Sequence, residues 1–347
     1  MAGILVLASE CEIPSGSVRE YTNNRPELRH NEICEKLKSQ HVPLIYITPK
    51  DECPLYCDSG YITFLRGGYK SALESRDKDW FSDDSLTPNH QTKNINDIRR
   101  VPLYKQAGFY INDYMSPIIE STWVNVTASL TLAEEAVRTA IHDNKVVYAL
   151  TPSPGHHATF SSGGGYCFLN NGAAAAMKFL SFGCKKGAIL DVDYHAGDGT
   201  QRIFYERSDV LTISIHANPY YEYPSFTGYE DETGTGSGEG YNVNYPLSQG
   251  TNWDIYKNVL IKALDKIKDF SPEFLIIPFG GDTYKDDPDQ NNLCRFELDL
   301  DDYRSMGRLI YSYYPDVPIV ITQEGGYNME NISTIVWNFL DSFRLRS

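Results

Sequence analysis

The stretch Gly187-Ala-Ile-Leu-Asp191-Val-Asp193-Tyr-His195 decides how this sequence folds and where its polar residues gather. Its first four residues are uncharged and are typical of a strand buried in a sheet. Side chains alternate along an extended chain, so Asp191, Asp193 and His195 point to one side. Charge at an apolar place is costly unless it is paired or bound to a metal. Two interpretations stay open, a site for zinc or a metal of similar hardness and a capped strand end whose aspartates begin a loop.

Similar apolar runs recur along the chain and predict further buried strands. With Ala188–Val192 they make seven: Ile4–Ala8, Leu44–Ile47, Val146–Leu150, Leu211–Ile215, Phe274–Phe279 and Ile319–Thr322. Segments with helical spacing lie between many of them: Thr127–His142, Asn170–Phe182, Trp253–Phe270 and Asp301–Tyr314. Strands that alternate with helices predict an α/β fold with a mainly parallel central sheet and helices on both faces. Function in such sheets lies at the carboxyl ends of the strands.

The bulk properties limit the class of protein. We expect residues 1–347 to form one domain, because α/β domains reach this length. The formal net charge of −15 argues against nucleic acid as a partner and is compatible with a small cationic substrate. No apolar run is long enough to cross a membrane. The seven scattered cysteines form an odd number, which favours a reducing compartment such as the cytoplasm.

Two segments break the alternation of strands and helices. Arg76–Arg100 is polar and long for a loop, which favours a functional or interface insertion. Pro219–Asn244 is rich in Gly and Tyr and follows a predicted strand, so we expect a long loop at the functional edge of the sheet. Its glycines do not form a phosphate-binding loop, because no Gly-Lys-Ser/Thr follows them.

Polar motifs follow several other predicted strands. Pro154-Gly-His156-His157 follows Val146–Leu150, Gly280-Gly-Asp282 follows Phe274–Phe279, and Glu324-Gly-Gly-Tyr327 follows Ile319–Thr322. His216 follows Leu211–Ile215. The carboxyl ends of parallel strands share one edge of the sheet, so all these side chains should converge there.

These motifs, together with Gly165-Tyr166-Cys-Phe-Leu-Asn170, Asp198-Gly and Asp287-Pro288, resemble the histone deacetylase superfamily and specifically its acetylpolyamine amidohydrolase branch. The resemblance spans about residues 145–330, and more loosely the first strand and Tyr61–Leu65. It implies the open arginase–deacetylase fold, in agreement with the pattern above. It also implies an enzyme, a zinc-dependent deacetylase, with Fe²⁺ as the other candidate metal.

The resemblance assigns roles residue by residue. Asp193, His195 and Asp282 would bind the metal and leave a position open for water and substrate. His156 and His157 would move protons, and the sequence does not decide which of them is the general base. Asp191 would orient His156, and Asp198 would orient His157. Tyr327 would donate its hydroxyl to the oxyanion.

Further sites are implied by the resemblance alone. One potassium ion would lie at main-chain oxygens of Asp191, Asp193, His195, Ser214 and Ile215. A second would lie near Phe204, Arg207, Val210 and Tyr241. The segment at Arg76–Arg100 resembles the loop with which relatives form a homodimer and narrow the cleft.

The resemblance also implies how substrate is selected. Tyr166 and Phe226 would form the walls of a narrow tunnel, and Asp289 would contact the distal ammonium of an acetylated polyamine such as acetylputrescine, acetylcadaverine or acetylspermidine. Met115 takes the place of an expected rim acid, with Asp113 and Glu120 nearby, which puts a second anionic contact in doubt. The alternatives are deacetylation of acetyl-lysine in proteins, an inactive module that binds acetylated ligands, and a two-metal ureohydrolase.

Overall fold

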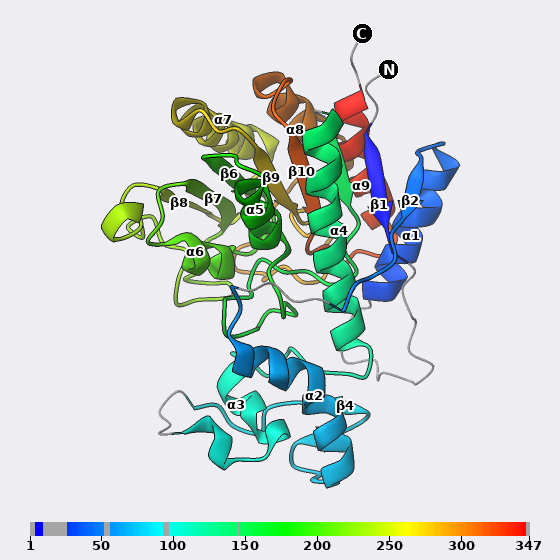
Figure 1. The fold of residues 1–347 in the computed structure, drawn as a ribbon. Helices are drawn as coiled ribbons and strands as arrows, with labels where there is room; N and C mark the ends of the chain where they lie inside the picture. The colour runs from blue at the N-terminus through cyan, green and yellow to red at the C-terminus, as the bar shows by residue number, and fades with distance from the viewer. Residues whose placement is uncertain (1–3, 10–25, 52–55, 93–96, 144–145, 345–347) are drawn as a thin grey trace.

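A computed structural model describes residues 4–9, 26–51, 56–92, 97–143 and 146–344 (Figure 1). At its centre lies an eight-stranded sheet in the order β2-β1-β5-β10-β9-β6-β7-β8, with every neighbouring pair parallel. The strands are β1 (Leu5–Ala8), β2 (Leu44–Tyr46), β5 (Val146–Ala149), β6 (Gly187–Asp191), β7 (Val210–Ala217), β8 (Asn242–Leu247), β9 (Leu275–Phe279) and β10 (Ile319–Gln323). The predicted α/β class with a parallel sheet is confirmed.

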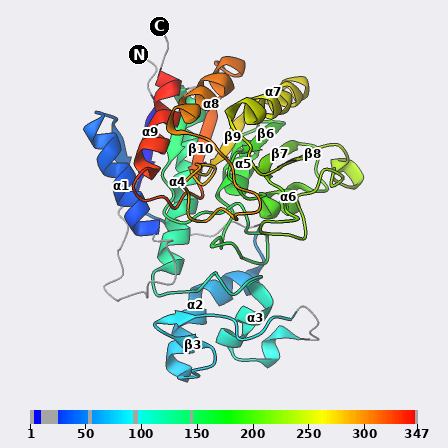
Figure 2. The ribbon, with the colours of Figure 1, turned by 180° about the vertical axis from the view of Figure 1, so that it is seen from behind.

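Helices cover both faces of this sheet, as expected for strands with no polar side. On one face lie α4 (Thr122–Asp143), α5 (Asn171–Ser181) and α6 (Asp198–Phe204). On the other lie α1 (Pro26–Ser39), α7 (Trp253–Phe270), α8 (Leu300–Tyr313) and α9 (Ile332–Asp341), which Figure 2 shows from behind. Strands β6, β9 and β10 are buried along their whole length, because they lie between these two layers.

The seven predicted strands are present, each within two residues of its expected bounds, but the eighth was missed. The segment Pro219–Asn244 was expected to be a loop throughout, but its last three residues, 242–244, belong to strand β8. Strand β8 reads Asn-Val-Asn-Tyr-Pro-Leu and has no continuous apolar run. Only β7 pairs with it, so it forms an edge of the sheet, where a proline such as Pro246 is tolerated because one side needs no hydrogen bonds.

A smaller lobe, which the structure describes over residues 56–92 and 97–121, lies beyond one end of the sheet (Figure 1). It contains α2 (Ser59–Ser75), the hairpin β3 (Phe81–Ser82) and β4 (Ser85–Leu86), two short 3₁₀ turns, η1 (Ile98–Arg100) and η2 (Leu103–Gln106), and α3 (Ala107–Tyr110). Asp58 caps α2 by accepting from the backbone N–H of Tyr61 at 2.8 Å. The described parts of the segment Arg76–Arg100, residues 76–92 and 97–100, are therefore part of a larger packed unit.

The lobe has a hydrophobic core that is distinct from the two cores against the sheet. Phe64, Trp80, Leu86 and Tyr110 are buried in it. Side chains of α4 and α5 close its inner side. No helix in the described part of the chain is both long and apolar enough to span a lipid bilayer.

Candidate active site

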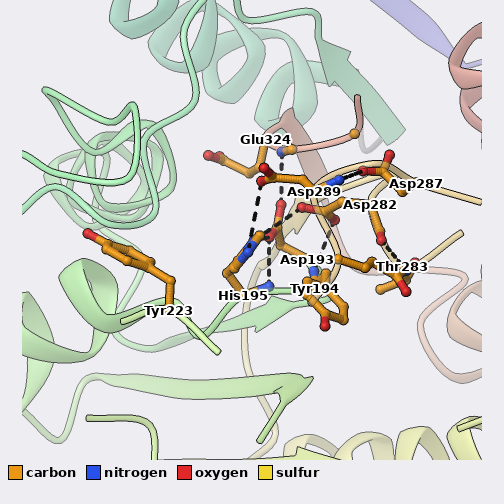
Figure 3. Close-up of polar contacts among 12 residues, drawn as sticks. Asp193, Tyr194, His195, Tyr223, Asp282, Thr283, Asp287, Asp289 and Glu324 are labelled. Carbon is orange, nitrogen blue, oxygen red and sulfur yellow. Dashed lines mark hydrogen bonds and ion pairs between the residues drawn. The ribbon is translucent and has the colours of Figure 1, made fainter. Parts of the chain in front are cut away.

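Three metal-ligating side chains meet where β6 and β9 end. Asp193 and His195 follow β6, and Asp282 follows β9. One ligand atom from each lies within 4.8 Å of the others, and all three residues are buried. His195 Nδ1 lies 3.4 Å from Asp193 Oδ1 and 3.4 Å from Asp282 Oδ2 (Figure 3). The side chains that the sequence predicted as ligands are thus brought together.

The chemistry of this group fits a divalent cation. Asp282 Oδ2 is buried and has no hydrogen-bond partner, which is costly for a carboxylate oxygen unless a cation binds it. Burial and the adjacent Asp193 raise the pKa of Asp282 to about 8, because two buried carboxylates this close together repel each other when both are charged. One nitrogen and two oxygen ligands leave a coordination position open, which is typical of catalytic zinc sites.

Glycine at position 325 allows the chain to pass close to the two carboxylates. A Cβ there would collide with the side chain of Asp282 and crowd that of Asp193. The Gly325 N–H instead donates to Asp193 Oδ2 at 2.8 Å. This bond fixes one oxygen of Asp193 and leaves Oδ1 on the side of His195.

Two histidines lie beside the metal group, each held by its own aspartate. His156 Nδ1 lies 3.1 Å from Asp191 Oδ2, and His157 Nδ1 lies 2.6 Å from Asp198 Oδ1. Both pairings agree with the predicted orienting roles. A carboxylate at Nδ1 keeps a proton on that nitrogen and leaves Nε2 for proton transfer.

The pKa values of the two imidazoles are shifted in opposite directions. Burial lowers the pKa of His156, but the charges of Asp193 and Asp191 outweigh it and raise that pKa to about 10. Burial also lowers the pKa of His157, and the nearby His156 and His195 lower it further. The His156 and His157 ring centroids are 4.0 Å apart, so both rings do not readily carry charge together. A general base must be neutral before it accepts a proton, and the lowered pKa of the buried His157 favours this ring for that role.

A pocket opens over these groups and is walled by three tyrosines. The Tyr166 and Tyr327 rings are 6.1 Å apart, and Tyr223 packs edge-on against His157 at 4.8 Å. Tyr166 has a φ of +66°, a conformation that L side chains seldom adopt and that often occurs at functional sites. The pocket is lined by Asp113, Met115, Pro154, His156, His157, Gly165, Tyr166, His195, Glu222, Tyr223, Asp289, Gly325 and Tyr327.

Asp113 joins the lobe to this pocket. Its Oδ2 accepts from the Gly165 N–H at 2.6 Å and from the Tyr223 hydroxyl at 3.3 Å. Its Oδ1 accepts from the backbone N–H of Met115 at 2.8 Å. Asp113 therefore holds two neighbouring parts of the pocket wall, Gly165 and Tyr223, and both of its oxygens already have donors.

Comparison with known proteins agrees with this geometry. The sequence model of the histone deacetylase domain matches residues 56–343. The chain belongs to the histone deacetylase family. The match covers the lobe, the metal group, both histidines and Tyr327.

Several relatives in this family are acetylpolyamine amidohydrolases. Acetylpolyamine amidohydrolase 1 of Pseudomonas aeruginosa is 39% identical over 320 residues, which are 91% of this chain and 90% of that protein. The acetylpolyamine amidohydrolase of Mycoplana ramosa is 35% identical over 82% of this chain and 80% of its own length. The crystal structure of acetylpolyamine aminohydrolase from Burkholderia pseudomallei superposes with a TM-score of 0.86 at 30% identity and covers 98% of both chains. The deacetylase fold predicted from the resemblance is therefore confirmed.

Of the three residues predicted from the deacetylase resemblance to contact substrate, two line the pocket and one does not. Tyr166 lines the pocket, and so does Asp289, whose Oδ2 lies 4.0 Å from His195 Nε2. Phe226 does not: its side chain is 94% exposed and it is absent from the pocket wall. Tyr223, three residues earlier in the same loop, lines the pocket. The loop turns away after Tyr223, and the side chain of Phe226 faces solvent.

The sequence did not predict that Tyr223 and Glu222 line the pocket. It placed Asp113 near the rim but did not predict that its side chain faces the pocket. Tyr223 and Glu222 lie in the Gly- and Tyr-rich loop, where no periodicity indicates which way a side chain points. The Xaa-Pro pair Tyr223-Pro224 marks a turn there, and this signal could have drawn attention to the tyrosine. Nothing in the sequence distinguishes Glu222 from its neighbours.

The residues expected to bind potassium fall into two groups. Asp191 and Ser214 are register partners on β6 and β7, so Ser214 and Ile215 lie beside Asp191, Asp193 and His195. The second group surrounds the turn from α6 to β7: Phe204 and Val210 end and begin these elements, the Arg207 N–H donates to Phe204 O, and the Thr212 N–H donates to Tyr241 O. The two groups are compact, and potassium in them stays a prediction.

His216, at the end of β7, gives an expected pH dependence of stability. Its Nδ1 lies 2.7 Å from Ser214 Oγ and its Nε2 lies 2.8 Å from the carbonyl of Gly228. Burial lowers its pKa to about 4, so the folded protein keeps this ring neutral. The unfolded chain binds this proton nearer pH 6.5, so the ring's contribution is full above that pH and is lost as pH falls toward 4.

We expect His216→Gln to show a weaker acid dependence than the parent. Between about pH 7 and pH 4 the parent should lose about 3 kcal/mol of unfolding free energy more than the variant. Urea unfolding of both proteins across this range measures the difference. Parallel curves for the two proteins would show that His216 does not titrate as inferred.

Proposed function

We propose that this deacetylase is a metal-dependent amidohydrolase that removes acetyl groups from small acetylated polyamines. The observation that carries the choice of substrate is the charge of the pocket. Asp113, Glu222 and Asp289 line it, and no Lys or Arg lines it in the described part of the chain. A substrate with a second amine is cationic and suits such a wall, because an opposite charge near a carboxylate stabilises both. The 39% identity to an acetylpolyamine amidohydrolase supports the same class.

The roles of the residues follow from their positions. Asp193, His195 and Asp282 would hold Zn²⁺, with Fe²⁺ as the second candidate. A bound divalent cation would acidify water and polarise the acetyl carbonyl. His157, the ring with the lowered pKa, accepts the proton from water, and Asp198 stabilises the charged ring that results. The pair His156–His157 then supplies the proton that the leaving amine needs.

Tyr327 also lines the pocket, with its ring 6.1 Å from that of Tyr166. Burial and the nearby Asp289 raise the pKa of its phenol well above the usual value, so the hydroxyl keeps its proton. A protonated hydroxyl can donate to the oxygen that becomes negative when water attacks. Its backbone N–H donates to Asp287 Oδ2 at 2.7 Å, which fixes the loop that carries it.

The main alternative is deacetylation of acetyl-lysine in proteins or peptides. A substrate panel on zinc-loaded protein separates the two, with N-acetylputrescine, N-acetylcadaverine and N8-acetylspermidine set against an acetyl-lysine peptide. We expect kcat/KM to be highest for an acetylated polyamine. A preference for the peptide would contradict the proposal, and no acetate release from any of them would favour a binding module.

Asp289 should recognise the distal ammonium of the substrate. Its side chain is one-third exposed and lies on the pocket wall. We expect Asp289→Asn to raise KM for N-acetylputrescine about 10–100-fold, because a hydrogen bond to a charged group is worth about 1.5–3 kcal/mol. The neutral analogue N-butylacetamide should be affected much less. Equal effects on both substrates would exclude this role.

A homodimer formed through the lobe is part of the proposal. Val101 and Leu73 of the lobe and Tyr114 and Met115 near the pocket mouth are exposed apolar side chains, which favours an interface on this side. A partner there would narrow the entrance and exclude bulky protein substrates. Light scattering of the purified protein measures the mass.

We also propose structural potassium at the two groups described above and a location in the cytoplasm.

A further inference from the structure

The imidazole of His195 has two nitrogens, and only one of them faces the other metal ligands. Its Nδ1 faces Asp193 and Asp282, so Nε2 points away from the metal group. A neutral imidazole that binds a metal through Nδ1 carries its proton on Nε2, and that proton needs an acceptor. In most histidine metal sites the acceptor is a carboxylate, a backbone carbonyl or water, and it sets the orientation of the ring.

Two carboxylates compete for this single proton. Glu222 Oε1 lies 3.8 Å from His195 Nε2, and Asp289 Oδ2 lies 4.0 Å from it. Both are within about 1 Å of hydrogen-bonding distance, or close enough for one bridging water. The two acids differ in how they are held.

Glu222 is buried and fixed by three donors. Its side chain is 10% exposed. Oε2 accepts from the Tyr194 hydroxyl at 3.1 Å and from the Asn291 N–H at 3.0 Å, and Oε1 accepts from the Tyr223 N–H at 2.9 Å. Since Tyr194 precedes His195 directly, the carboxylate is tied to the segment that carries the ring.

Asp289 is held only through its backbone. Its N–H donates to Asp287 Oδ1 at 3.0 Å, and no described residue donates to its carboxylate. Its side chain is 33% exposed, so it can turn toward a ligand. Figure 3 shows it beside His195 and the metal group.

We propose that Glu222 is the positioning residue of His195: it accepts the Nε2–H and fixes the ring for the metal, which leaves Asp289 free for the substrate ammonium. The second half of this division of labour rests on the proposed function. The first half concerns the metal group alone and can be tested without any substrate.

The test compares Glu222→Gln with the matched control Glu232→Gln. Glu232 lies in the same loop and accepts from Gln201, Thr227 and the backbone of Gly228, all at 2.7 Å, but it does not face His195. Zinc affinity is measured by competition with a chelator, and thermal unfolding of the metal-free proteins checks the fold. We expect Glu222→Gln to bind zinc about 10–100-fold more weakly and Glu232→Gln to bind it like the parent.

A spectroscopic measurement on the parent guards against a variant that does not fold. In the zinc-loaded protein labelled with ¹⁵N-histidine, the Nε2–H of His195 should give a resonance protected from exchange with solvent. Absence of any protected His195 N–H would overturn the proposal, as would unchanged zinc affinity in Glu222→Gln or equal losses in the two variants. Weak zinc binding by Glu222→Gln in an enzyme that deacetylates no acetylated polyamine would uphold the role of Glu222 and reject the proposed function.

Discussion

An Asp193→Asn protein should emerge from zinc loading and dialysis with almost no bound metal. Asp193 supplies one of only two carboxylates in the metal group, and it is completely buried, so water cannot take its place easily. An amide brings no charge to offset that of the cation. Elemental analysis of the dialysed protein measures the metal content, and deacetylation should fall with it.

Asp191→Asn is the matched control, because the two aspartates are neighbours on the same side of one strand end. Asp191 Oδ2 contacts His156 Nδ1 and its Oδ1 accepts from the Asp193 N–H at 3.1 Å, so it touches the site through other groups. This variant should keep most of its zinc and lose roughly 10–100-fold in rate. Equal metal loss in both variants would refute the division between ligand and orienting residue.

Tyr327→Phe should lower kcat about 10²–10³-fold while zinc content and KM change little. The substitution removes one hydroxyl donor and keeps the ring, which packs under the Arg29 guanidinium at 5.6 Å and beside Tyr166. A donor that stabilises only the oxyanion contributes to the rate and not to the binding of substrate. Steady-state kinetics on the best substrate of the panel measure both constants.

Tyr166→Phe is the matched control for Tyr327→Phe. It removes a phenol from the same pocket, with ring centroids 6.1 Å apart, but from a residue proposed only as a wall. Its kcat should stay within about tenfold of the parent, well short of the loss expected of an oxyanion donor. Similar losses in the two variants would mean that Tyr327 acts by packing.

The buried strands could be predicted from sequence because their apolar runs have no other explanation. The edge strand β8 could not, since its pairing with β7 depends on a neighbour and its sequence carries Asn and Pro. Helix α1 was missed for a related reason: its described apolar residues are few, with Ile33, Cys34 and Leu37 buried and Leu28 exposed, and its buried side also carries Arg29 and His30.

The candidate site divides in the same way. Residues at strand ends, such as Asp193 and Asp282, are placed by the sheet, so the prediction that they meet needed only the strand assignments. Residues in the loop after β7 are placed by contacts with other segments. Glu222 is held by Tyr194 and Asn291. Phe226 follows the turn at Tyr223-Pro224 and its side chain is exposed; the sequence marks the turn but does not indicate which way the side chains after it point.

The separate core of the lobe has a consequence for how this molecule can change. Several hydrogen bonds tie the lobe to the loops around the metal group, among them Tyr61 Oη to the carbonyl of Phe168 at 2.7 Å, the Gly165 N–H to Asp113 Oδ2 at 2.6 Å and the Tyr166 N–H to Ser116 Oγ at 2.9 Å. Phe168 and Leu169 of these loops also belong to the core of the lobe. A change inside the lobe would therefore displace Gly165 and Tyr166, so the lobe cannot be exchanged as a unit without altering the pocket wall.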